Sequence, residues 1–173
     1  MDFNEELTFE IKKAVKNVLA DLFSNGENYY YITLVTDGLA NTPTVSCWSA
    51  EALSRVCEED RYYCKWSYTD SPYCCWKQEY FDSVKQMLLG RKAMTKLTDE
   101  EFNAEYNLRL SAMEAAMVQL DREGLFSINQ DRENVVVLVE VMPPDYTNTE
   151  RAHRMNSGTS KIFREWLDEA AEE

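Results

Sequence analysis

Residues 98–123, TDEEFNAEYNLRLSAMEAAMVQLDRE, carry one continuous hydrophobic stripe. Thr98 and Glu101 have the spacing of a capping box at its start, and Gly124 is typical of a helix end. At 1.5 Å per residue this helix would be about 39 Å long, so we expect the rest of the chain to pack against it. The apolar residues recur every three or four positions, which places them on one helix face: Phe102, Tyr106, Leu110, Met113, Met117 and Leu120.

The segments before this helix predict one helix and two strands. Residues 4–23 have the apolar spacing of an amphipathic helix. Residues 29–36, YYYITLVT, are dense in aromatic and β-branched residues, which predicts a central strand covered on both faces. Residues 44–48 predict a second short strand. The connection between the strands is too short for a parallel crossover, so we expect antiparallel pairing.

The remaining segments complete an α+β pattern, because the strands are grouped instead of alternating one for one with helices. We therefore predict a single domain over residues 1–173. It has a small, mainly antiparallel sheet of three to four strands packed against several helices, one of them long and central. The further expected elements are helices over 50–62 and 78–89, an extended piece over 125–128, a strand over 135–142, a polar loop over 145–158 and a last helix capped by Thr159 or Ser160.

Composition narrows the classes of partner. The chain is 45% hydrophobic and 12% aromatic, which excludes a disordered chain, and its net charge is −13. Nucleic acid and anionic membranes carry the same sign of charge and are not expected partners, whereas a basic protein is. The alternative is that the acidity only keeps the protein soluble. The acidic N-terminus is unlike a signal peptide and no apolar run reaches membrane-spanning length, so we expect a cytoplasmic protein.

The sequence contains no recognisable catalytic, metal or cofactor motif. The five cysteines lack the paired spacing of zinc ligands, and their odd number suits free thiols in a reducing compartment. His153 is the only histidine and has no partner placed beside it by the sequence. The five glycines form no phosphate loop. We therefore expect no enzymatic activity, no cofactor and no small-molecule substrate.

Residues 62–76 are the most aromatic and least regular part of the chain. Such a loop either closes over the core or forms a recognition surface, since tyrosine and tryptophan are common binding hot spots. Acidic residues concentrate in three segments, 51–60, 99–105 and 165–173, and their charge would steer a basic partner. The partner-binding residues that we predict are Asp37, Glu58, Glu59, Asp60, Trp66, Tyr68, Asp70 and Tyr73.

The order of several soft motifs resembles a bacterial family known as domain of unknown function 4303. The motifs are the strand YYYITLVTDG (29–38), the segment NTPTVSCWSAEAL (41–53), RYYCKW (61–66) and Trp76 before Tyr80-Phe81. Residues 68–75 depart from the pattern as an insert. The late strand and the closing helix also fit the family, so the likeness covers most of the chain.

This resemblance implies an immunity protein that protects a bacterium from a polymorphic or contact-dependent toxin, in many cases a nuclease. It assigns no catalytic residue. We expect the protein to bind its cognate basic toxin and to occlude the toxin's active site. Two alternatives stay open: an adaptor or regulatory domain that binds another protein or peptide, and an enzyme whose site the sequence does not reveal.

Overall fold

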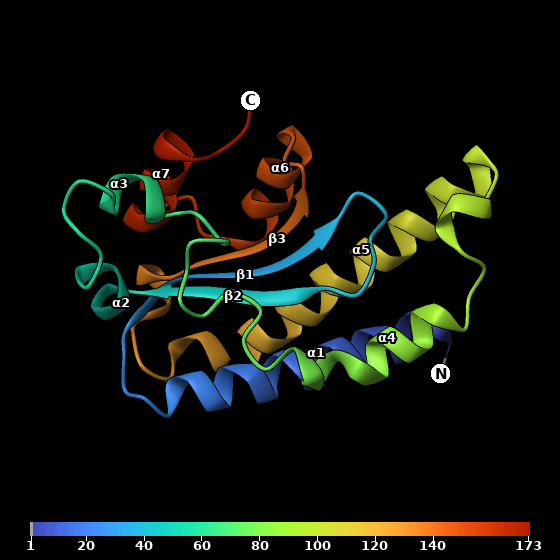
Figure 1. The fold of residues 1–173 in the computed structure, drawn as a ribbon, viewed down its shortest axis with the longest axis horizontal. Coiled ribbons are helices and arrows are strands. Elements are labelled where there is room, and N and C mark those ends of the chain that lie inside the picture. The colour runs from blue at the N-terminus through green and yellow to red at the C-terminus, as the bar shows by residue number, and fades with distance from the viewer. Residues whose placement is uncertain (1) are drawn as a thin grey trace.

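The structure is a computed structural model that describes residues 2–173. Its α-helices and strands alternate irregularly along the chain, with short 3₁₀ turns between them (Figure 1). In chain order the elements are α1 (Phe3–Phe23), β1 (Tyr29–Asp37), β2 (Thr44–Ser49), α2 (Ala50–Ser54), α3 (Arg61–Cys64), η1 (Gln78–Phe81), α4 (Asp82–Leu89), η2 (Met94–Lys96), α5 (Asp99–Arg122), η3 (Leu125–Ser127), η4 (Arg132–Asn134), β3 (Val136–Met142), α6 (Tyr146–Met155) and α7 (Lys161–Glu169).

The three strands form one sheet in the order β2-β1-β3, which confirms the α+β fold and the central place of β1. β1 pairs antiparallel with β2, as predicted, and Leu34 lies opposite Val45. β1 pairs parallel with β3, where Leu34 lies beside Val139. The sheet is therefore mixed. The long path through α4 and α5 supplies the crossover that parallel pairing requires.

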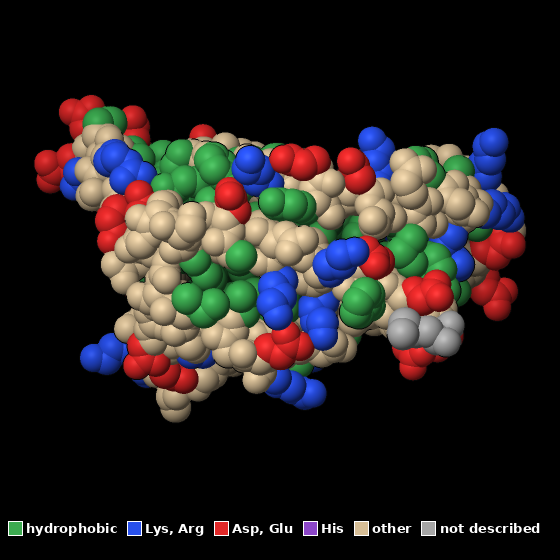
Figure 2. All heavy atoms as spheres, turned by 90° about the horizontal axis from the view of Figure 1, so that it is seen from below, with side chains coloured by type: hydrophobic (Ala, Val, Ile, Leu, Met, Phe, Trp, Pro, Cys, Tyr) green, Lys and Arg blue, Asp and Glu red, His purple; other side chains and the backbone are tan. Residues whose placement is uncertain are grey.

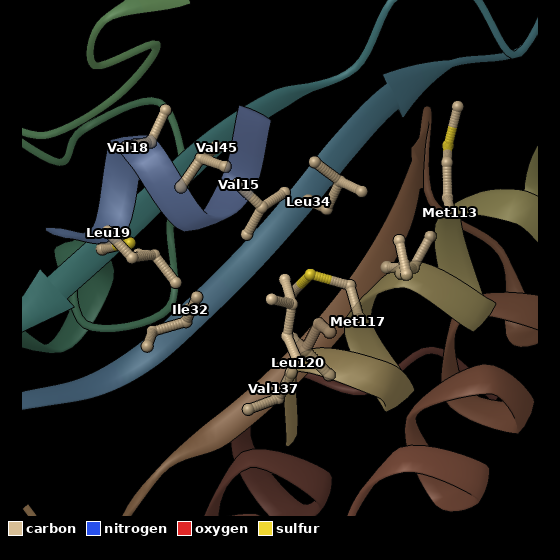
Figure 3. Close-up of a cluster of buried hydrophobic side chains, with 14 of the residues drawn as sticks. Val15, Val18, Leu19, Ile32, Leu34, Val45, Met113, Met117, Leu120 and Val137 are labelled. Carbon is tan, nitrogen blue, oxygen red and sulfur yellow. The ribbon is translucent and has the colours of Figure 1, made fainter. Parts of the chain in front are cut away.

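One face of the sheet packs on α1 and α5 (Figure 1). Ile32 and Leu34 of β1 point into this layer (Figure 3), and both are fully buried. Such burial contributes roughly 1.5–3 kcal/mol per large aliphatic side chain. The side chains that meet them come from both helices and from β3: Val15, Val18, Leu19, Met113, Met117, Leu120 and Val137.

The long helix begins and ends where the sequence predicts. Thr98 accepts a hydrogen bond from the backbone N–H of Glu101, and the Glu101 carboxylate accepts one from the backbone N–H of Thr98 at 2.9 Å. This is the predicted capping box. Gly124 adopts a left-handed conformation with φ +78° just beyond the helix, a conformation that glycine adopts at little cost.

The other face and the free edge of β3 are covered by α6, α7 and the aromatic segment after α3 (Figure 1). The prediction of a polar loop over residues 145–158 is wrong, because α6 occupies most of it. Asp145 caps α6 by accepting from the N–H of Thr147 at 2.9 Å. Asn148 and Asn156 use their side-chain amides to bind both backbone groups of Val141 and Val137, respectively. Polar side chains of α6 therefore face the sheet, where an amphipathic helix usually presents apolar ones.

Two other predicted elements differ from the structure. The helix expected over residues 50–62 is interrupted, since α2 ends at Ser54 and the chain turns before α3. The Arg61 side chain binds the carbonyls of Ser54 and Val56 at 2.8 and 2.9 Å and so holds this turn. Residues 125–128 do not form an extended piece but begin with the 3₁₀ turn η3, which buries Leu125 and Phe126.

Candidate partner-binding surface

The turn before α3 presents acidic and aromatic side chains together. Glu58, Glu59 and Asp60 are all exposed. Beyond Arg61, the side chains of Tyr62 and Tyr63 are 65% and 76% exposed, and their rings meet edge to face with centroids 5.6 Å apart. Tyrosine rings are frequent anchors of protein interfaces.

Helix α7 adds a second acidic segment to this place. Lys65, just after α3, contacts both Glu165 and Glu169 of α7, the latter at 2.9 Å. The indole Nε1 of Trp66 donates to Glu169 at 2.7 Å. Burial alone would raise the pKa of Glu169, but the hydrogen bonds from Lys65 and Trp66 lower it, so this carboxylate stays ionised.

We name the combined region the α3–α7 surface. A hollow of about 300 Å³ lies within it, between the exposed tyrosines and the end of α7. Two of the three acidic segments of the sequence therefore meet in space, while residues 99–105 lie at the start of α5 (Figure 1). The α3–α7 surface consists of Glu58, Glu59, Asp60, Tyr62, Tyr63, Trp66, Glu165 and Glu169.

Trp66 and Tyr68 lie half-buried beneath this surface. The Trp66 ring meets the rings of Tyr30 and Tyr31 edge to face, with centroids 5.5 and 6.0 Å apart. The backbone carbonyl of Tyr68 accepts a hydrogen bond from Ser46 of β2 at 2.7 Å. The aromatic segment is thus attached to the sheet at these residues, and Trp66 keeps one part open to the hollow.

Asp70 and Tyr73 occupy different environments. Asp70 is exposed, and it lies close to Cys64, whose pKa is raised by partial burial and then by the charges of Asp70 and Asp60. Tyr73 is only 9% exposed, and its hydroxyl donates to Glu27 at 2.6 Å. Asp70 therefore lies beside the acidic turn, whereas Tyr73 closes over the core.

Asp37 is remote from the other predicted residues. It ends β1, while Tyr30 near the start of the same strand binds the carbonyl of Lys65. Asp37 is seven positions further along the strand than Tyr30, which corresponds to about 23 Å at roughly 3.3 Å per residue. The Asp37 carboxylate accepts from the backbone N–H groups of Leu39 and Asn41, so it shapes the β1–β2 turn. The eight predicted residues therefore do not form one patch.

Sequence reasoning missed the most exposed part of this surface. Tyr62 and Tyr63 belong to the aromatic stretch but were not among the predicted contacts, and Glu165 and Glu169 were seen only as part of an acidic tail. Their local signal is weak. An exposed position for two adjacent tyrosines follows from the break between α2 and α3, which the sequence does not predict.

The face formed by α1 and α4 differs from the α3–α7 surface. Figure 2 shows basic, acidic and hydrophobic side chains interspersed across it. Several of its lysines are paired, with Lys12 and Lys16 near Glu123 and Lys13 near Glu10. Opposite charges on this face therefore largely cancel, and it has no field of one sign.

The thiols and the histidine do not assemble into a site. Among residues 2–173, no group of three or more His, Cys, Asp or Glu side chains could hold a metal ion. All five cysteines are free; Cys74 and Cys75 lie 3.5 Å apart, and burial raises the pKa of Cys74 to about 11. His153 is exposed on α6 against the ring of Phe163.

One acidic side chain of the sheet is buried. Glu140 of β3 is buried, and the hydroxyl of Tyr31 donates to its carboxylate at 2.7 Å. Burial raises the pKa of Glu140, although hydrogen bonds and the charge of Arg151 oppose the shift.

No helix in the described part of the chain has the length and apolar character needed to cross a membrane.

Comparisons with known proteins place the chain in a family. Neither the curated proteins nor the solved structures yielded a match. A family model for a domain of unknown function, DUF4303, matches residues 11–157, a range that runs from α1 through α6 and includes the whole sheet. Since this match covers most of the 173 residues, the chain belongs to the DUF4303 family.

Proposed function

We propose that this protein is an immunity protein that binds a basic bacterial toxin domain and blocks its active site. The observation that carries the proposal is the α3–α7 surface, where two exposed tyrosines lie between two acidic segments. The net charge of −13 and the resemblance described above support the same conclusion. Nuclease toxins suit such a partner, because their active sites are cationic for nucleic acid.

Each part of the surface has a distinct role in this mechanism. Glu58, Glu59 and Asp60 attract the cationic cleft and accelerate the encounter. Tyr62 and Tyr63 enter the interface as anchors, since they bury much area while losing little side-chain freedom. Asp70 extends the acidic rim. Tyr68 accepts a hydrogen bond from Ser46 of the sheet and Tyr73 donates one to Glu27, and both contacts fix the position of the aromatic segment.

The first experiment identifies the partner and then tests the surface. The tagged protein is isolated from its own bacterium, and a single stoichiometric partner of high pI that is toxic when expressed alone is the expected result. A partner that is neutral and harmless would favour the adaptor alternative. Absence of any partner would return attention to an unrecognised enzymatic site.

The second experiment measures affinity for that partner with matched charge reversals. Changing Glu58, Glu59 and Asp60 to Lys should weaken binding at least tenfold, because three charges that attract a basic partner are replaced by three that repel it. The control changes exposed acids elsewhere on the molecule by the same total charge: Glu6→Lys, Glu79→Lys and Glu100→Lys. Equal loss of affinity in both triple variants, with far-UV circular dichroism unchanged, would rule out a specific role for the α3–α7 surface.

A further inference from the structure

A hollow of about 370 Å³ lies between the β1–β2 turn, the end of α4 and the connection to α5. These segments lie toward the right-hand side of Figure 1, on the opposite side from α3 and α7. The volume is within the range of small-molecule sites in proteins. The hollow is therefore a second candidate site, separate from the α3–α7 surface.

The charged side chains that line this hollow are all basic. They are Lys85 of α4, Arg91 of the connection and Arg109 of α5, and no Asp or Glu is among its lining residues. Lys85 has no ion-pair partner within 4 Å among residues 2–173. In a chain with a net charge of −13, such a group of cations is an unusual local environment.

Arg109 is the central group. Its side chain is 3% exposed; Nε donates to Glu105 at 2.9 Å and Nη1 to the carbonyl of Ala40 at 3.3 Å. Nη2 has no acceptor within residues 2–173. Among residues 2–173, the fully buried side-chain atoms that lack a hydrogen-bond partner are in Thr33, Thr44 and Gln78. Arg109 Nη2 is not among them, so this atom is accessible to solvent. Free N–H donors of this buried guanidinium therefore face the hollow.

The neighbouring acid does not cancel this charge. Glu105 accepts from both Arg91 and Arg109, and chiefly the hydrogen bond from Arg91 holds its pKa below the usual range. One carboxylate between two guanidinium groups leaves one positive charge, and Lys85 adds another. Arg91 also lies over the ring of Phe3, 4.1 Å from its centroid, which fixes its orientation.

We propose that this hollow binds a small molecule carrying a phosphate or carboxylate group on a short apolar body. Arg109 and Lys85 provide charge-assisted donors for the oxyanion, which are about twice as strong as neutral ones. Thr42 and Thr95 line the same hollow, and a threonine hydroxyl can donate to an oxyanion. Leu88, Leu89 and Met94 supply the apolar side for the rest of the ligand.

The test is a titration followed by backbone amide chemical shifts in dilute salt. The probes are butyl phosphate, butyrate and inorganic phosphate, with butanol as the uncharged control. We expect saturable shifts at Asn41, Thr42 and Thr95 with a Kd below about 1 mM for one charged butyl probe, and weaker binding as salt is added. The tighter of the two charged butyl probes identifies the head group. The proposal would be overturned if butanol bound as tightly as butyl phosphate and butyrate do. It would also be overturned if neither charged butyl probe gave saturable shifts.

Variants then test the residues. Lys85→Ala should weaken binding about threefold to fivefold, in line with the loss of one exposed charge contact, and Thr95→Val should weaken it to a similar extent. The matched control is Lys161→Ala, an exposed lysine on α7 outside the hollow. Arg109 is avoided because its contacts with Glu105 and Ala40 also support the fold. Unchanged affinity in both Lys85→Ala and Thr95→Val would contradict the proposed binding mode.

Discussion

At the scale of single residues, the buried carboxyl group of Glu140 should make stability depend on pH. Burial raises the pKa of Glu140 in the folded state, whereas in the unfolded chain it is near 4.3. The folded protein therefore binds this proton more tightly. The group's contribution is fully present below the unfolded pKa and is lost as pH rises through the folded pKa. Each tenfold difference in proton affinity between the two states corresponds to about 1.4 kcal/mol of folding free energy.

The variant Glu140→Gln should remove this dependence, because the amide stays neutral and can still accept from Tyr31. Urea unfolding is measured for both proteins from about pH 4 to about pH 8, where the group changes its charge. We expect the variant's free energy of unfolding to rise relative to that of the natural protein as pH increases. Glu150→Gln, an exposed position on α6, is the control. A difference that does not vary with pH would contradict the prediction.

Tyr73 offers a second test at the scale of single residues. Its hydroxyl joins Glu27, which also accepts from Ser49 and Arg55. Tyr73→Phe keeps the ring and removes that hydrogen bond, so the free energy of unfolding should fall by about 1–2 kcal/mol. Tyr63→Phe, at an exposed position, should change it by less than about 0.5 kcal/mol. Equal effects would mean that the Tyr73 hydroxyl contributes nothing measurable.

At the scale of elements, α6 protects the outer edge of the sheet through polar side chains. Asn148 binds both the N–H and the carbonyl of Val141, at 2.8 and 3.0 Å, in the manner of a neighbouring strand. Asn156 does the same for Val137, and Arg151 binds the carbonyl of Val139 between them. An unpaired edge strand invites association with other chains, and this arrangement prevents it.

Asn148→Ala should therefore cost about 2–4 kcal/mol, because two buried backbone groups lose their partners at once. The variant should also aggregate more readily, which light scattering would detect. Glu150→Ala on the exposed side of the same helix is the matched control and should leave both properties nearly unchanged. A loss smaller than about 1 kcal/mol in Asn148→Ala would mean that water replaces the side chain without penalty.

The elements that the sequence predicted well are those whose signals are local. The capping box, apolar stripe and terminal glycine of α5 all lie within the helix or next to it, and the structure confirms them. α6 was missed because Asn148 and Arg151 are polar yet buried, which inverts the usual pattern. The break between α2 and α3 depends on Arg61 reaching back to Ser54, a contact that periodicity does not reveal.

At the scale of the whole molecule, the candidate surface could be predicted only in part. The acidic and aromatic segments were visible in the sequence, but their meeting depends on Lys65 contacting Glu165 and Glu169 about a hundred residues later. Asp37 lies at the end of β1, whereas the α3–α7 surface lies near the start of that strand, where Tyr30 binds the carbonyl of Lys65. Composition therefore predicts which residues could bind, and only the fold decides which of them lie together.

The sheet is covered by α1 and α5 on one face and by α6, α7 and the aromatic segment on the other, and the cooperativity of these two layers can be tested. Met117 is fully buried between α5 and the sheet, whereas Trp48 donates to the Ser67 carbonyl of the aromatic segment and Trp66 belongs to that segment. If the chain is a single cooperative domain, Met117→Ala should lower stability by about 2–5 kcal/mol. Tryptophan fluorescence and far-UV circular dichroism should then give the same shifted midpoint. Leu89→Ala, at an exposed position, is the control. A fluorescence transition that stays in place while circular dichroism shifts would show that the two sides of the sheet unfold separately.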